Sequence, residues 1–139
     1  AATRDKSYFT RSEIEVKRDG PTYTVDTLEM FIKEYGSSVE LYLLVGLDAL
    51  AQLNYWRKPE RVIDLCRVVG IGRPGVQDVD LESVCKGLSE KTIIVDSPMV
   101  QLSSTDIRDR VKKNQTIKHM VPLRVEEYIY SMGLYGDST

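Results

Sequence analysis

Polar residues directly follow the short apolar runs of this sequence, which is where an open parallel sheet binds its ligands. Gly46-Leu47-Asp48 comes after the first long run. A glycine lets a ligand approach the backbone closely, and a carboxylate accepts hydrogen bonds from ribose hydroxyls. An ordinary turn in which Asp48 caps the next helix is the alternative. Arg73, which precedes a Pro-Gly turn, faces either a phosphate or solvent.

A second set of polar residues begins at Ser103. Together with Asp106 three residues later, it predicts a helix start of the capping-box type, whose free backbone N–H groups bind anions. Arg108 lies close to the positive end of this helix, where a cation costs about 0.3–1 kcal/mol unless negative charge is nearby. Asp106 is one candidate for that charge. A phosphate chain, held by hydroxyls, backbone N–H groups and the guanidinium, is the other.

Trp56, the only tryptophan, is a third candidate. It follows Leu50 and Leu53 at helical spacing and precedes Arg57-Lys58-Pro59, which has the character of an exposed loop. Its ring can therefore either stack on a planar ligand or anchor the core.

The remaining reactive side chains offer little. Cys66 and Cys85 have no C-x-x-C spacing and only one histidine, His119, to complete a metal site, so we expect buried free thiols and no protein-held metal. His119 has no obvious partner, and we assign it no role.

The elements that must position these residues alternate between strand and helix. Near-continuous apolar runs predict strands buried on both faces, as in parallel sheets, and strict alternation at residues 13–17 predicts a half-exposed or edge strand. The three runs cover residues 39–45, 68–72 and 92–95. Helices are expected at 24–36 with Thr24 as N-cap and Gly36 as stop, at 50–53, 60–65, 81–88 and 104–113, and from Pro122 to Gly133. This order predicts an α/β fold with a mostly parallel sheet flanked by helices.

Composition limits the class of protein. With 139 residues, 42% of them hydrophobic and 29% charged, the chain has the size of one soluble globular domain. A net charge of -2 argues against nucleic acid as a partner. No stretch approaches the roughly 20 apolar residues of a membrane span, and the first residues do not resemble a signal peptide. The cytoplasm fits best.

Several segments resemble one known family in their order along the chain. Residues 18–28, R-D-G-P-T-Y-T-V-D-T-L, are similar to its R-x-G-x-[ST]-Y-T-x-D-T-L segment. The Gly46-x-Asp48 strand end, the L-x-x-L-x-x-W run ending at Trp56 and the Arg73-Pro74-Gly75 turn follow. Residues 102–108, L-S-S-T-D-I-R, resemble its [IVL]-S-[SA]-T-x-[IV]-R nucleotide motif, and residues 121–135 resemble its C-terminal helix. From about residue 13 to 135 the sequence thus resembles the bacterial nicotinate-nucleotide adenylyltransferases, of the nucleotidyltransferase superfamily.

The resemblance implies a Rossmann-like fold, a single domain over residues 13–135 with an upstream remnant or tail at 1–12 and a tail at 136–139, and a reaction of NAD synthesis. In that reaction nicotinate mononucleotide and ATP, with magnesium, give deamido-NAD and pyrophosphate. The resemblance places the nicotinate at Thr24, Tyr55 and Trp56. It places the nucleotide at Gly46, Asp48, Arg73, Ser104, Thr105 and Arg108.

The chain also departs from the family. A first strand, a G-G-T-F-D-P-x-H-x-G-H segment whose histidines meet the transferring phosphate, and a second strand do not occur in these residues. We therefore expect little or no activity from this chain alone. The run at 39–45 would expose an apolar edge, so we expect either that two copies pair there or that residues 1–10 cover it.

Three other interpretations stay open. The chain could be a pantetheine-phosphate adenylyltransferase, which shares the serine-threonine-arginine motif but lacks the Y-T-x-D-T and tryptophan signals. It could be a non-catalytic nucleotide-binding module, which the missing histidines favour. An α/β domain without any ligand would require the motif order to be chance.

Overall fold

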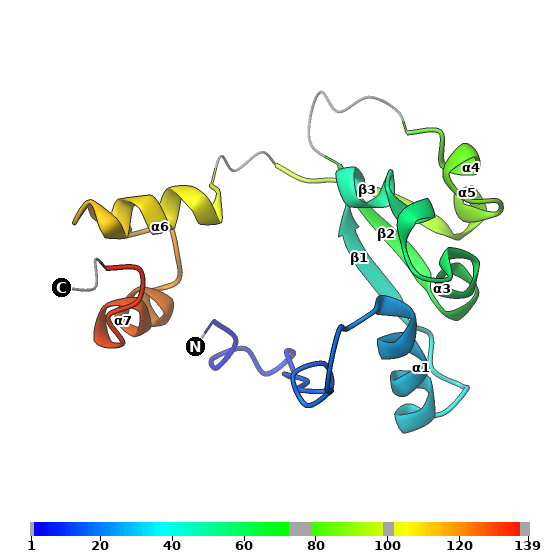
Figure 1. Cartoon of the computed structure of the whole chain (residues 1–139), viewed down its shortest axis with the longest axis horizontal. Helices are drawn as coiled ribbons and strands as arrows, with labels where there is room; N and C mark the ends of the chain where they lie inside the picture. The colour runs from blue at the N-terminus through cyan, green and yellow to red at the C-terminus, as the bar shows by residue number, and fades with distance from the viewer. Residues whose placement is uncertain (1, 73–78, 99–101, 137–139) are drawn as a thin grey trace. The chain divides into compact units, whose positions relative to one another are not determined.

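The computed structural model describes residues 2–72, 79–98 and 102–136, which group into two compact units. The larger unit is Ser12–Met99, and the smaller one joins Ala1–Arg11 to Val100–Thr139 (Figure 1). Each unit has its own cluster of buried apolar side chains. The assignment of residues 13–135 to a single domain stays a prediction.

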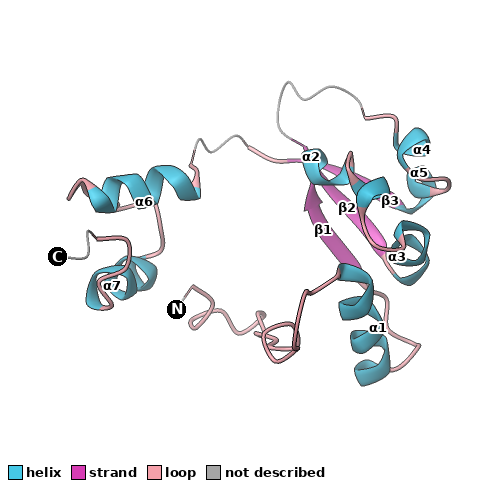
Figure 2. Ribbon diagram, viewed as in Figure 1, coloured by secondary structure: helices cyan, strands magenta, loops and turns pink. Residues whose placement is uncertain are grey.

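The larger unit contains a sheet of three parallel strands in the order β1-β2-β3 (Figure 2). The strands are β1 (Tyr42–Gly46), β2 (Arg67–Gly72) and β3 (Thr92–Asp96). β2 and β3 match the predicted runs to within one residue, and β1 begins three residues later than the run at 39–45. The predicted parallel α/β arrangement is confirmed. β1 lies at an edge of this sheet, as expected.

The strand predicted at residues 13–17 is wrong. Residues 14–17 form turns instead, and the Lys17 N–H donates to the Glu13 carbonyl oxygen at 3.0 Å. The Lys17 ammonium also pairs with the Glu13 carboxylate at 3.2 Å. These local bonds satisfy the backbone without a neighbouring strand, which periodicity alone could not reveal.

Six short helical elements connect and cover the strands. They are α1 (Thr24–Tyr35), α2 (Leu47–Leu50), the 3-10 turn η1 (Leu53–Tyr55), α3 (Pro59–Leu65), α4 (Leu81–Val84) and α5 (Leu88–Lys91). Gly36 ends α1 with a φ of 88°, as predicted, but the N-cap is Tyr23 and Thr24 is already helical. The helix predicted at 50–53 begins earlier, directly after β1, and the one at 81–88 is split by Gly87 at a φ of 79°.

The helices bury one face of the sheet, where Val68 and the helical residues Leu50 and Leu53 have no exposed surface. On the opposite face, Leu44 is 63% exposed and Ile93 is 44% exposed. The expectation that these strands are buried on both faces is therefore wrong for this unit. An apolar run indicates that a strand can be buried on both faces. It does not show whether helices of the same unit cover both faces.

The smaller unit consists of α6 (Ser104–Lys112), α7 (Leu123–Ser131) and the N-terminal segment. Val111, Ile117 and Ile129 form its core. The Arg124 Nε lies 2.6 Å from the Asp5 carboxylate, which ties the N-terminal segment to α7. Pro122 occupies the N-cap of α7 rather than its first helical position, and the helix ends at Ser131, before Gly133. These are shifts of one or two residues from the prediction.

Both cysteines are buried and free, as expected. The Cys66 thiol donates to the Val62 carbonyl oxygen at 3.2 Å, and burial raises its pKa to about 11. The thiol is therefore protonated at neutral pH. No helix among the described residues is long and apolar enough to span a bilayer.

Gly70 lies in β2 where α2 packs against the sheet. A Cβ atom at this position would lie 3.0 Å from Leu47 Cδ2 and 3.1 Å from Leu50 Cδ2. We expect Gly70→Ala to lower the free energy of unfolding by about 1–3 kcal/mol, because the two leucine side chains must give way to admit the methyl group. Urea denaturation measures the change.

Gly46→Ala is the matched control, since a Cβ at Gly46 would meet nothing within 4 Å. Equal losses of stability in the two variants would contradict the tight packing of α2 on β2.

Candidate functional site

The first group of candidate residues lies at the carboxyl ends of the strands in the larger unit. Gly46 ends β1 and is the N-cap of α2, so Asp48 falls in the first turn of that helix without a capping hydrogen bond to its side chain. The alternative that Asp48 caps the helix is therefore wrong, and its carboxylate is exposed to solvent. Arg73 lies outside the described residues.

Asp96, at the end of β3, belongs to the same edge of the sheet. It pairs in register with Gly72, and its Oδ1 would lie 3.5 Å from a Cβ built on that glycine. The sequence showed the Asp96-Ser97-Pro98 strand end but gave no reason to assign it a role. Two carboxylates and two glycines thus follow or end neighbouring parallel strands.

The second group comprises Thr24, Tyr55 and Trp56. Trp56 follows η1, packs against the core cluster and is only partly buried. Its ring is therefore a core contact that also keeps some surface accessible. Tyr55 is 82% exposed, whereas Thr24 is half-buried at the first position of α1.

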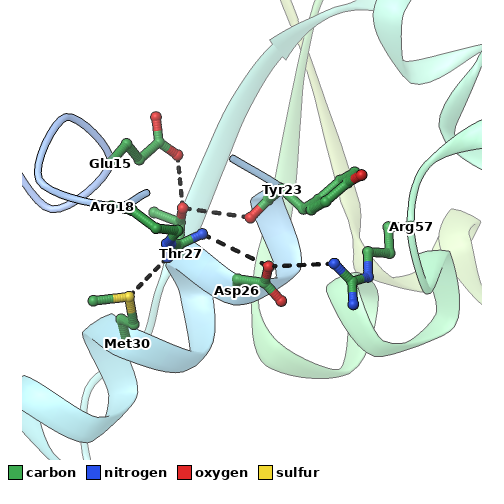
Figure 3. A network of polar contacts seen from close by, with 7 residues as sticks. All are labelled: Glu15, Arg18, Tyr23, Asp26, Thr27, Met30 and Arg57. Atoms are coloured by element: carbon green, nitrogen blue, oxygen red, sulfur yellow. Dashed lines mark hydrogen bonds and ion pairs between the residues drawn. The ribbon is translucent and has the colours of Figure 1, made fainter. Parts of the chain in front are cut away.

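Contacts between Tyr23 and Arg57 bring the two segments of this second group together (Figure 3). The Arg57 guanidinium lies 4.6 Å from the centroid of the Tyr23 ring, and its Nη1 lies 3.8 Å from Asp26 Oδ2. Tyr23 directly precedes Thr24, and Arg57 directly follows Trp56. The start of α1 therefore lies beside the segment that carries the tryptophan.

The same Asp26 oxygen faces a second guanidinium. Arg18 Nη1 lies 3.7 Å from it, and Arg18 Nη2 donates to the Met30 sulfur at 2.7 Å. The Arg18 side chain is only 17% exposed, and its Nη1 has no hydrogen-bond acceptor within the described part of the chain. A buried cation without a counter-charge is costly, so Asp26 compensates Arg18 as well as Arg57.

Sequence reasoning missed this network. It named Asp26 only as a letter of the Y-T-x-D-T segment and Arg57 only as part of a loop. The available signal was weak: an aspartate three residues after Tyr23 lies on the same side of a helix start, and an arginine follows the tryptophan.

The third group is at the start of α6, in the smaller unit. Ser103 accepts a hydrogen bond from the Asp106 N–H at 3.0 Å, which confirms the predicted N-cap. Its hydroxyl donates to Asp106 Oδ2 at 2.6 Å, while Arg108 Nη2 donates to the Thr105 hydroxyl at 3.3 Å. Asp106 and Arg108 thus form hydrogen bonds with different partners, and both explanations for Arg108 stay predictions. Ser104, Thr105 and Arg108 are exposed on the first turns.

A parallel sheet with glycines at the ends of β1 and β2, joined by helices, defines the class of Rossmann-like α/β nucleotide-binding folds. The chain belongs to the cytidylyltransferase-like family, whose model matches residues 1–110.

Two curated relatives carry a more specific name. The probable nicotinate-nucleotide adenylyltransferase of Moorella thermoacetica is 40% identical over 138 residues, which cover 96% of this chain and 64% of that protein. The protein of the same name from Dehalococcoides mccartyi is 41% identical over 137 residues, covering 96% of this chain and 67% of that protein. The chain thus spans about two thirds of the length of these relatives.

A solved structure confirms the fold. The nicotinic acid mononucleotide adenylyltransferase of Plasmodium falciparum, complexed with APC, superposes with a TM-score of 0.66 over 84% of this chain and 60% of that one. Its sequence identity is 18%, so this likeness concerns the fold alone.

Proposed function

We propose that this chain provides the substrate-binding part of a nicotinate-nucleotide adenylyltransferase. The observation that carries the proposal is the 40–41% identity, over 96% of the chain, to two proteins of that name. In the reaction, a phosphate oxygen of nicotinate mononucleotide attacks the α-phosphorus of ATP. The new P–O bond gives deamido-NAD, and the bond to the β-phosphate breaks to release pyrophosphate.

The nicotinate side of the site is the group around Trp56. Its partly exposed ring would stack on the pyridine, with Tyr55 beside it. Thr24 opens α1, and Tyr23 supplies no side-chain cap, so the first-turn N–H groups of this helix suit a carboxylate. The contact between Tyr23 and Arg57 supports the proposal because it brings these two elements together.

We assign nucleotide contacts to the other two groups, each within its own unit. Gly46 would let the adenosine approach the backbone. The Asp48 carboxylate, which does not cap α2, would accept hydrogen bonds from the ribose hydroxyls. Ser104, Thr105 and Arg108 would hold the ATP phosphates. The hydrogen bond from Arg108 to the Thr105 hydroxyl places a cation and a hydroxyl side by side for this purpose. Arg73 is a further, weaker candidate.

Magnesium would enter with ATP. Among the described residues, no three or more histidine, cysteine, aspartate or glutamate side chains gather into a group that could hold a metal ion. Bound to the phosphates, the ion would neutralise their charge. We place the protein in the cytoplasm, because its two thiols are free and unpaired cysteines suit a reducing compartment.

A non-catalytic nucleotide-binding module is the second candidate. One observation favours it: the only histidine of these 139 residues, His119, is exposed and stands apart from any H-x-G-H pattern. Turnover and binding must therefore be tested separately.

Binding is tested with nicotinate mononucleotide and Mg-ATP by calorimetry. We expect the mononucleotide to bind the chain and Trp56→Ala to weaken it about tenfold or more, since stacking of a base on an aromatic ring contributes about 1–3 kcal/mol. Trp56→Phe, which keeps a ring, should retain most of the affinity.

Tyr35→Ala is the control, because Tyr35 is an accessible aromatic residue, 57% exposed, at the far end of α1. Equal losses in the Trp56→Ala and Tyr35→Ala variants would contradict the assignment of Trp56.

Turnover is tested by following deamido-NAD formation. We expect little or none from the 139-residue chain, because it contains no histidine pair to meet the charge that develops on the transferring phosphate. Formation above background, with a contaminating enzyme excluded by a mock purification, would overturn this expectation and the second candidate with it.

We also propose that two copies associate through the uncovered side of the sheet. β1 is an edge strand, and on the open face Leu44 is 63% and Val95 46% exposed. Open edges and apolar faces favour pairing. Sedimentation should show a dimer that Leu44→Lys converts to a monomer. A monomer at every concentration would contradict pairing and leave the alternative, that residues 1–10 cover the edge.

A further inference from the structure

Arg57 is connected to α1 through two different contacts. Its guanidinium lies over the Tyr23 ring at 4.6 Å, and its Nη1 faces the Asp26 carboxylate at 3.8 Å. We propose that Arg57 is a positioning residue, which fixes the segment of Trp56 against the start of α1 so that the ring is preorganised for the nicotinate. This inference rests on the proposed function, since it assigns Trp56 to that ligand.

The local backbone explains why the segment needs such a contact. Lys58 adopts the left-handed conformation, with φ 52° and ψ 61°, directly before Pro59 begins α3. A residue with a side chain is disfavoured in that region, so surrounding contacts must hold it there. The Trp56 N–H donates a hydrogen bond to the Leu53 carbonyl oxygen at 2.9 Å, and the ring packs partly on the core.

Of the two arginines that face Asp26, Arg57 is the one that can be replaced without leaving a buried charge unpaired (Figure 3). Asp26 is shared between Arg18, 17% exposed, and Arg57, 50% exposed. Arg18 has an additional contact with Met30, whereas in the part of the chain that the structure describes Arg57 contacts only Tyr23 and Asp26. Replacing Asp26 would strand the largely buried Arg18, but replacing Arg57 leaves the pair of Arg18 and Asp26 in place.

Arg61 supplies a matched control. Its Nε lies 3.1 Å from Glu29 Oε1, so it too joins the α3 region to α1, and its side chain is likewise 50% exposed. Arg61→Gln therefore removes the same charge and another ion pair to α1, formed with Glu29 instead of Asp26.

The experiment uses the intact 139-residue chain and two measurements. Trp56 is the only tryptophan, so its fluorescence anisotropy and its quenching by acrylamide report on this segment alone, without any ligand. Calorimetry with nicotinate mononucleotide reports the affinity. We expect Arg57→Gln to raise the quenching, lower the anisotropy and weaken binding about two- to fivefold, the scale of one exposed ion pair with a cation–π contact. Arg61→Gln should change none of these.

Three other results would overturn the positioning role of Arg57. Unchanged fluorescence in Arg57→Gln, or an equal change in Arg61→Gln, overturns the positioning role while leaving the proposed function intact. Weaker binding with unchanged fluorescence also overturns it, because Arg57 would then contact the ligand directly. Failure of the unaltered chain to bind the mononucleotide refutes the proposed function at this site, and the inference with it.

Discussion

Leu50 and Leu53 are fully buried against one face of the sheet, and the rest of the larger unit depends on this contact. Full burial of such a side chain contributes about 1.5–3 kcal/mol. Because Gly70 has no side chain, α2 can approach β2 closely enough for Leu50 to reach that position. α2 begins immediately after Gly46. The same close packing therefore positions both the end of β1 and the first turn of α2, which carries Asp48.

Ion pairs hold the more accessible residues near the start of α1. One carboxylate, Asp26, faces the largely buried Arg18 and the half-exposed Arg57. The inner pair compensates a charge that would be costly to bury alone, whereas the outer pair is close to solvent and is weak on its own. The ring of Tyr23 adds a second contact to that outer arm. Both ion pairs therefore share the same oxygen atom of Asp26.

The candidate residues are divided between the two compact units. The tryptophan group and the strand ends belong to the larger unit, and the serine-threonine-arginine group opens α6 in the smaller one. The family matches residues 1–110, so it includes the first turns of α6 as well as the sheet. Under the proposed function most of the work would be positioning, and each group would supply a different contact, by stacking, to ribose or to phosphate.

The sequence by itself determined the local structure and the family resemblance. The three strands, the Gly36 stop and the Ser103 cap were predictable because runs of apolar residues, a glycine at positive φ and a hydroxyl at a helix start act within a few residues. The motif around Trp56 was visible for the same reason. Periodicity failed at residues 14–17, where local turns satisfy the backbone instead of a neighbouring strand.

Only the tertiary structure decided which face of the sheet is covered and that Asp48 does not cap α2. It also decided that Asp26 forms ion pairs with both Arg18 and Arg57. These features depend on contacts between segments far apart in the sequence. No local propensity encodes such contacts, because their energy arises only when packing brings the two groups together and excludes water between them.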